Sequence, residues 1–180
     1  MEEIDLINGL KQQKEEAFIE LVNLFKKKVI NLCYSYTEDR DEAEDLSQEV
    51  FLSLYNSIRN FRGDSLLSTY IYKITLSKCI DYKRKRKIIS LLTGFPQARK
   101  EISIDVDDKL YVRQIINGLN RDMKIVIVLH YYIGLNYREI SEVLNTSTKA
   151  VEGKIYRAKQ KMRKEFEKEG YRICSKNGIL

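Results

Sequence analysis

Aromatic and basic side chains are interleaved in one stretch of the 180-residue chain, and this mixture suits the binding of nucleic acid. The stretch holds three tyrosines and two lysines and ends in five consecutive cations: Tyr70, Tyr72, Tyr82, Lys73, Lys78 and residues 83–87. Aromatic rings can stack on unpaired bases, and cations neutralise phosphates. Gly63, shortly before the stretch, would allow the backbone to approach a nucleotide closely. A solvated basic helix end above core tyrosines is the alternative interpretation.

A second basic segment has the pattern of a helix–turn–helix. Asn136 and Glu139 form a capping-box pair at the start of a short helix, residues 137–144. Asn145, Thr146 and Ser147 would form the turn, since Ser147 suits the N-cap of a following helix. That following helix carries seven cations outside its apolar stripe: Lys149, Lys154, Arg157, Lys159, Lys161, Arg163 and Lys164.

The apolar stripe of this last helix determines which residues face outward. The stripe predicted to be buried consists of Val151, Ile155, Ala158, Met162 and Phe166. The residues expected to face base edges are Thr148, Lys149, Glu152 and Gly153. The pattern predicts a DNA-reading module, and a helical hairpin with a basic solvated face is the alternative.

An acidic helix presents a different kind of surface. Its core face is predicted to hold Ala43, Leu46, Val50, Leu54 and Ile58. The opposite face carries Asp45, Gln48, Glu49 and Leu52, with Phe51 at the border. An apolar side chain among acids indicates a protein-docking surface. Single exposed leucines are also common on surfaces without a partner.

The residue types needed for metal or disulfide chemistry are sparse. The 3 cysteines, Cys33, Cys79 and Cys174, form no disulfide framework or metal-ligand pattern, and His130 is the only histidine. Three neighbouring acids at 105, 107 and 108 lack the ligand spacing of a calcium loop. We therefore expect no metal and no cofactor. Residues 1–50 contain a single arginine, Arg40, and no paired carboxylates of catalytic layout, which argues against a DNA enzyme such as a recombinase. We also expect a cytoplasmic protein, since no apolar run approaches membrane length and the N-terminus is acidic.

The expected elements are almost entirely helical, because the chain has 1 proline and 8 glycines, too few breakers for a many-turned β protein. Helices are predicted over 15–36, from the acidic segment 37–45 to about residue 58, over 66–87, and from 109 to about 168. The predicted fold class is all-α, with two small domains and a flexible linker, the second domain being a helix–turn–helix of winged-helix-like type. The boundaries are 1–88, a linker over 89–108, 109–170, and a tail over 171–180.

Charge is segregated along the chain. The formal net charge of +6 is the sum of −7 over residues 1–50, +9 over 51–100 and +4 over 101–180. This segregation indicates two kinds of partner of opposite charge.

Two motifs resemble bacterial extracytoplasmic-function (ECF) sigma factors, the small group of the sigma-70 family. The first is DEAEDLSQEVFLSLY (41–55) followed by FRGDSLLSTYIYKITLSKCIDYKRKRK (61–87). The second is LNYREISEVLNTSTKAVEGKIYRAKQKMRK (135–164). With the linker, they cover nearly the whole chain. The resemblance implies a non-enzymatic factor with a region 2 and a region 4 domain. Such a factor binds core RNA polymerase, recognises −10 and −35 promoter elements and promotes promoter opening.

The resemblance also implies roles for particular positions. The residues expected to bind the polymerase clamp are Asp45, Gln48, Glu49, Phe51 and Leu52. Those expected at the −10 element, where a loop captures a flipped base, are Asn60, Phe61, Arg62, Gly63, Asp64, Tyr70, Lys73, Ser77, Lys83, Arg84, Lys85 and Arg86. Those expected at the −35 element are Tyr137, Arg138, Ser147, Thr148, Lys149, Glu152, Gly153, Lys154, Arg157 and Lys161.

Some positions depart from the family pattern. Tyr70 stands where tryptophan is frequent, Ser77 where asparagine is frequent, and Glu152 where lysine is usual. An acid at position 152 can accept a hydrogen bond from cytosine but repels phosphate. The resemblance further implies a stress-response regulon and a regulator, a membrane-anchored anti-sigma factor, although the chain itself is not expected to be a membrane protein. A free-standing helix–turn–helix regulator is the main alternative, and it leaves the acidic helix unexplained.

Overall fold

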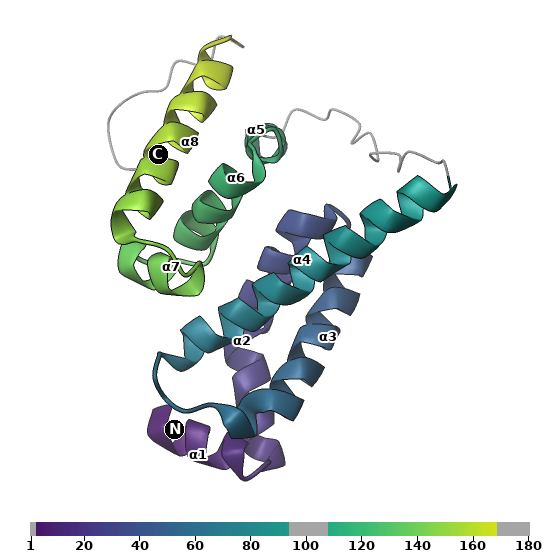
Figure 1. Cartoon of the computed structure of the whole chain (residues 1–180), viewed down its shortest axis with the longest axis vertical. Helices are drawn as coiled ribbons and strands as arrows, with labels where there is room; N and C mark the ends of the chain where they lie inside the picture. Colours follow the sequence, from purple (N-terminus) through teal and green to yellow (C-terminus); the bar gives the residue numbers. More distant parts are fainter. Residues whose placement is uncertain (1–2, 94–107, 169–180) are drawn as a thin grey trace. The chain divides into compact units, whose positions relative to one another are not determined.

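The computed structural model describes residues 3–93 and 108–168 and divides the chain into two units, 1–97 and 98–180. Every element in the described ranges is helical (Figure 1). The first unit comprises α1 (Glu3–Lys11), α2 (Glu15–Thr37), α3 (Arg40–Ser57), the short 3₁₀ helix η1 (Ile58–Asn60) and α4 (Leu67–Thr93). The second comprises α5 (Asp108–Asn117), α6 (Arg121–Ile127), the π-helical turn η2 (Val128–Tyr132), α7 (Tyr137–Val143) and α8 (Thr148–Lys168). These elements confirm the all-α prediction.

The first unit is built around α2, α3 and α4, which pack against one another. The predicted core face of α3 is confirmed, because Ala43, Val50 and Leu54 are at most 1% exposed. Tyr72 of α4 is also fully buried and its ring lies edge-on to Phe25, so the expectation that it stacks on bases is wrong. Burial of these large side chains supplies the main driving force for this unit.

The boundaries of α3 and α4 follow from local chemistry. Asp39 caps α3, and its carboxylate accepts hydrogen bonds from the backbone N–H groups of Asp41 and Glu42 at 3.0 and 3.2 Å. Helix α4 continues to Thr93, six residues beyond the predicted end at Lys87 and into the range assigned to the linker. The extension carries Ile88, Ile89 and Leu91, which are at least 50% exposed and so lack the periodic burial on which the prediction relied. The rest of the predicted linker, the acids at 105 and 107, Cys174 and the predicted tail lie outside the described residues.

Helix α1 was not predicted. Leu6 and Leu10 lie one turn apart and are buried, which is a short version of the same helical periodicity. Gly9 is required beside them, since a Cβ at this position would lie 2.8 Å from the Cβ of Ala17.

Two of the cysteines are neighbours in space although they lie 46 residues apart in the sequence. Cys33 and Cys79 are both fully buried free thiols, with their Sγ atoms 4.0 Å apart. The hydrogen bond to Cys33 and, next, burial raise the pKa of the Cys79 thiol, so it stays protonated. A buried, protonated thiol is a poor nucleophile and acts here as a core side chain.

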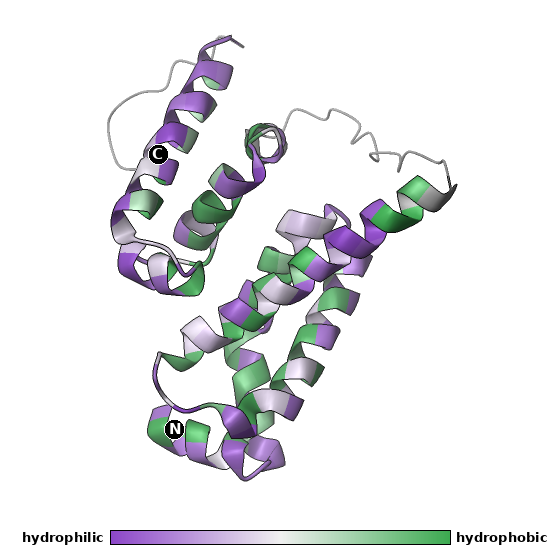
Figure 2. Cartoon of the chain, viewed as in Figure 1, coloured by the Kyte–Doolittle hydropathy of each residue, from purple (hydrophilic) through white to green (hydrophobic). Residues whose placement is uncertain are grey.

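The second unit encloses a small core beneath α8. Val151, Ile155, Ala158, Met162 and Phe166 are all buried, which confirms the predicted stripe. Figure 2 shows that the rest of α8 is mostly hydrophilic. Every element among residues 108–168 is helical, as the predicted helix–turn–helix domain requires. His130 is structural, with its Nδ1 2.8 Å from the carbonyl oxygen of Leu135.

Candidate protein and nucleic-acid interfaces

The outer face of α3 carries the acidic stripe, formed by Asp45, Gln48, Glu49 and Leu52, all of them exposed. Leu52 is 63% exposed. Within the part of the chain that the structure describes, Asp45 and Glu49 make no ion pair. The stripe therefore presents two uncompensated carboxylates and an apolar side chain on a rigid helix, as a docking surface requires.

Phe51 does not belong to this stripe. Only 8% of it is exposed, and it lies with the core side chains of α3. Phe51 lies at the border of the helical wheel, so only the packing of neighbouring helices determines whether it is buried. Its burial does not support the expected direct contact with polymerase. Tyr55, one turn after Leu52, extends the exposed face and was missed. Its i+3 spacing from Leu52 was the available signal.

The loop between η1 and α4 is anchored from beneath by two aromatic rings. Phe61 is 5% exposed, and its ring centroid lies 5.0 Å from that of Tyr70. The hydroxyl of Tyr70 donates to Ser57, whose Oγ is 3.0 Å away. Phe61 is thus a buried support and not an exposed nucleotide contact as predicted, whereas Tyr70 remains half-buried at the edge of the loop.

The tip of this loop is open to solvent. Asn60, Arg62, Gly63 and Asp64 are all exposed. Gly63 has φ +85°, and a Cβ added there would meet nothing within 4 Å, so glycine is needed for its backbone conformation alone. The loop presents its polar groups above an aromatic floor, a shape that could receive a base removed from its stack.

The exposed side of α4 continues from this loop. Tyr70, Lys73 and Ser77 follow one another at spacings of three and four residues, and Lys73 and Ser77 are exposed. Arg84, Lys85 and Lys87 are exposed further along the helix. Lys83 is exposed as well, with its ammonium group 5.7 Å from the ring centre of Tyr36.

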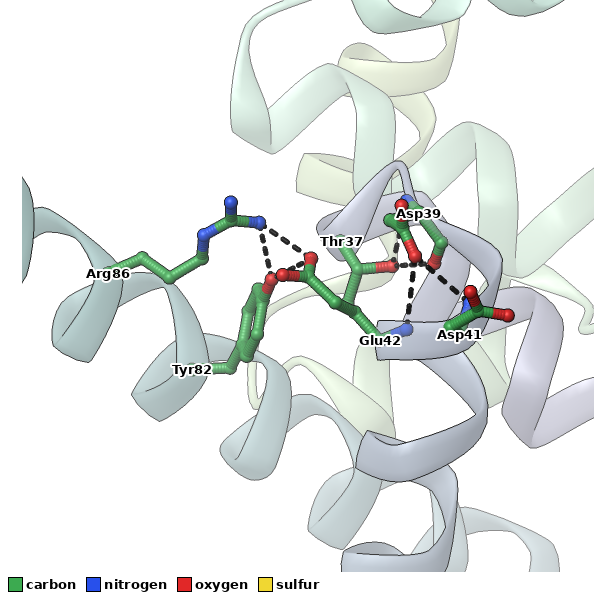
Figure 3. Close-up of polar contacts among 6 residues, drawn as sticks. All are labelled: Thr37, Asp39, Asp41, Glu42, Tyr82 and Arg86. Carbon is green, nitrogen blue, oxygen red and sulfur yellow. Dashed lines mark hydrogen bonds and ion pairs between the residues drawn. The ribbon is translucent and has the colours of Figure 1, made fainter. Parts of the chain in front are cut away.

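Arg86 differs from the other cations at this end of α4. Its guanidinium donates to the carboxylate of Glu42 at 2.7 Å and to the hydroxyl of Tyr82 at 2.5 Å (Figure 3). Tyr82 in turn donates to Glu42. Burial and, next, this hydrogen bond raise the pKa of Tyr82 to about 12, so the phenol is a donor at neutral pH. The expected contact of Arg86 with DNA is therefore not supported by its surroundings.

The helix–turn–helix is held by the caps that the sequence predicts. The capping box of Asn136 and Glu139 is present, with Glu139 accepting from the Asn136 backbone N–H at 2.8 Å. The side chain of Ser147 accepts from the backbone N–H of Ala150 at 3.2 Å. Thr148 reaches back to Ser141, 3.4 Å away, and Asn145 adopts φ 49° in the turn. These contacts orient α8 relative to α7.

The side chains of α8 divide into two groups. Lys154 pairs with Asp122 at 3.0 Å, and Lys161 donates to the carbonyl oxygen of Gly118 at 3.1 Å. Both predicted DNA contacts are thus engaged within their own unit. In the first half of α8, the exposed side chains that make no ion pair or hydrogen bond with the described part of the chain are Lys149, Glu152, Tyr156 and Arg157.

The remaining −35 candidates lie around the same surface. Tyr137 is half-buried, with its ring 5.1 Å from that of His130, and Arg138 is exposed and 3.4 Å from Glu142. Gly153 is half-buried, and the guanidinium of Arg157 lies along it. Tyr156, 64% exposed, was missed although it lies one turn after Glu152 on the outer face.

The described part of the chain can be assessed for metal-ligand clusters and for membrane-spanning helices. Within the described residues, no group of three or more metal-ligating side chains occurs, and no helix is long and apolar enough to span a membrane. A helix–turn–helix with exposed cations, a helix with a basic end and an exposed acidic stripe together fit a helical DNA-binding adaptor.

Family comparisons identify that adaptor. Sigma-70 region 2 matches residues 21–88, and Sigma-70 region 4 matches residues 109–162. The chain belongs to the sigma-70 family and is a sigma factor of its ECF group. Sigma factors are transcription initiation factors that bind RNA polymerase and promoter DNA, and they are not enzymes.

Individual relatives cover nearly the whole chain. The ECF RNA polymerase sigma factor SigW of Bacillus subtilis is 28% identical, over 89% of this chain and 94% of its own length. The ECF sigma-E factor of Escherichia coli is 27% identical, over 86% of this chain and 89% of its own length. The structure of CnrH in complex with the cytosolic domain of CnrY has a TM-score of 0.74 at 23% identity and covers 92% of this chain and 97% of its own. The sigma factor RpoE from Bartonella quintana, solved with the anti-sigma factor NepR, has a TM-score of 0.68 at 18% identity, over 83% and 96% of the two chains.

Proposed function

We propose that this sigma factor uses its three surfaces for three separate tasks. The acidic stripe of α3 docks on the polymerase clamp, the loop and outer face of α4 hold the −10 element, and the start of α8 reads the −35 element. The observation that carries the proposal is the stripe of Asp45, Glu49 and Leu52, because an exposed apolar side chain beside carboxylates without an ion pair among the described residues fits a protein partner and is not explained by DNA binding. Transcription from core polymerase on addition of this protein tests the assignment as a whole.

Promoter opening is proposed to depend on the loop at 60–64. Removing a base from its stack costs a few kcal/mol, which a fitted protein pocket can offset. Exposed polar groups at the tip and half-buried Tyr70 at the edge of the loop would supply such a receptor, which buried Phe61 supports from beneath. Cations along α4 would hold the phosphates of the same strand.

A change at Gly63 tests the role of this loop. Gly63→Ala places a side chain at φ +85° and should cost roughly 1 kcal/mol of local stability, so it should reshape the loop. Gly63→Asn should lose less, because asparagine tolerates this region better. We expect permanganate reactivity of unpaired −10 thymines to fall in the order wild type, Asn, Ala, at unchanged binding to core polymerase. Equal reactivity of all three proteins would contradict the assignment.

Regulation is proposed to follow the pattern of the structural relatives. CnrH is described with the cytosolic domain of CnrY, and RpoE with the anti-sigma factor NepR. By analogy, an anti-sigma factor, membrane-anchored or not, would cover the acidic stripe or the DNA-facing surfaces until a stress signal releases the protein. The site of action would be the cytoplasm, where core polymerase and promoter DNA are found.

A further inference from the structure

The five consecutive cations at the end of α4 are not equivalent. Lys85 and Lys87 are exposed and have no ion-pair or hydrogen-bond partner among the described residues. Arg84 is largely exposed and only 3.8 Å from Asp81 of its own helix. The side chain of Arg86 is 32% exposed, and within the described ranges it alone of the five forms an ion pair with another helix, through Glu42. Lys83 contacts another helix only through the ring of Tyr36.

The partner of Arg86 is itself held in place. Glu42 lies in the first turn of α3, and its backbone N–H donates to the capping carboxylate of Asp39. Its side chain accepts from both Arg86 and Tyr82, while the guanidinium carbon of Arg86 lies 5.5 Å from the ring centre of Tyr82 (Figure 3). Each of the three groups therefore contacts the other two, which favours one arrangement over independent side-chain motion.

We infer that Glu42, Tyr82 and Arg86 form a lock that positions the basic end of α4 against the start of α3. Within the proposed function, on which this inference rests, the lock joins the polymerase-binding helix to the −10 helix. Arg86 is a positioning residue, and the cations left to contact phosphate at this end of α4 are Lys83, Arg84, Lys85 and Lys87.

The salt dependence of DNA binding separates these two kinds of cation. A cation that contacts phosphate releases counterions, and its loss lowers the slope of log K against log salt by about 0.7 to 0.9. A cation already paired with Glu42 adds nothing to this slope. The test uses the full chain bound to core polymerase, with promoter DNA that this complex transcribes.

Arg86→Gln should leave the salt slope unchanged, while Lys85→Gln should lower it by about 0.7 or more. A fall in the slope with Arg86→Gln as large as that with Lys85→Gln would overturn the lock. If neither Lys85→Gln nor Lys87→Gln changes the slope, the proposed phosphate contacts of α4 fail, and the lock is then decided by the following cycle alone.

A double-mutant cycle tests whether Glu42 and Arg86 act as a unit. Glu42→Gln and Arg86→Gln should each reduce open-complex formation about fivefold, and the double variant should be no worse than either one. Binding to core polymerase should stay within about twofold for all three, because neither residue lies on the acidic stripe. Multiplied losses in the double variant would show that the two residues act separately and would refute the lock.

Tyr82→Phe provides a milder variant in case the charge changes disturb folding. It removes two hydrogen bonds, one donated to Glu42 and one accepted from Arg86, and no charge, so it should lower open-complex formation with an unchanged salt slope. Undiminished opening in this variant would remove Tyr82 from the lock. A shared thermal transition for all variants and the wild type, followed by circular dichroism, would separate positioning from unfolding.

Discussion

Replacing Leu52 by Asp together with Glu49 by Lys should abolish binding to core RNA polymerase while the protein stays folded. Leu52 is 63% exposed at the C-terminal end of the acidic stripe, and a buried apolar anchor at an interface contributes about 2 kcal/mol or more. The introduced carboxylate would be left without a partner in that interface, and Glu49→Lys places a cation against a basic partner surface. We expect a loss of affinity above about 100-fold, measured by fluorescence anisotropy with labelled protein.

The control for this prediction is Leu24→Asp on α2. Leu24 is 56% exposed and matches Leu52 in residue type and accessibility, but it lies outside the stripe. Both variants should keep the free energy of unfolding within about 0.5 kcal/mol of the wild type, as exposed substitutions usually do. Affinity of the stripe variant within threefold of the wild type would refute the clamp assignment.

Arg157→Ala should weaken promoter binding about 5- to 150-fold, and only on DNA that carries the −35 element. Arg157 is exposed on the first half of α8 and has no ion pair among the described residues. A bidentate contact from such an arginine to guanine discriminates by about 1 to 3 kcal/mol. Competition binding of the polymerase complex to DNA with an intact and a scrambled −35 element measures this difference.

Arg163→Ala is the matched control on the same helix. Arg163 pairs with Glu167 at 2.9 Å and lies near the end of α8. Its loss should affect both DNAs equally and by little. If Arg157→Ala lowers affinity for the intact and the scrambled DNA by the same factor, Arg157 contacts phosphate and does not read bases.

Helical periodicity explains why the core could be predicted so fully. The buried stripes of α3 and α8 follow spacings of three and four residues, and every residue named for these two stripes is buried. The caps at Ser147 and Asn136 could also be predicted from the sequence, since capping depends on residues only three positions apart.

The expectations that the structure does not support concern residues whose surroundings are set by distant parts of the chain. Phe51, at the border of the helical wheel, and Phe61, in the loop, were assigned to interfaces because their burial depends on neighbouring helices and on Tyr70. Arg86 and Lys154 were assigned to DNA because their partners, Glu42 and Asp122, lie 44 and 32 residues away in the sequence. No local spacing rule connects residues at these separations.

These distant ion pairs also change how the net charge of +6 should be interpreted. Charge segregation along the sequence indicated partners of opposite charge. However, Arg86 and Lys154 form ion pairs inside their own units, and Lys161 donates a hydrogen bond to the backbone of its own unit. The cations available to DNA are consequently fewer than the sequence suggests, and their number sets the expected salt dependence.

Transcription with purified components tests the central claim most directly. The protein is added to core RNA polymerase and a genomic template library, and the 5′ ends of the transcripts are sequenced. We expect transcripts that start at defined positions behind shared −10 and −35 sequences, and that disappear when the Leu52→Asp, Glu49→Lys variant replaces the wild type. The absence of any promoter-specific transcript on every template, or undiminished transcription with that variant, would contradict the sigma-factor mechanism proposed for this chain.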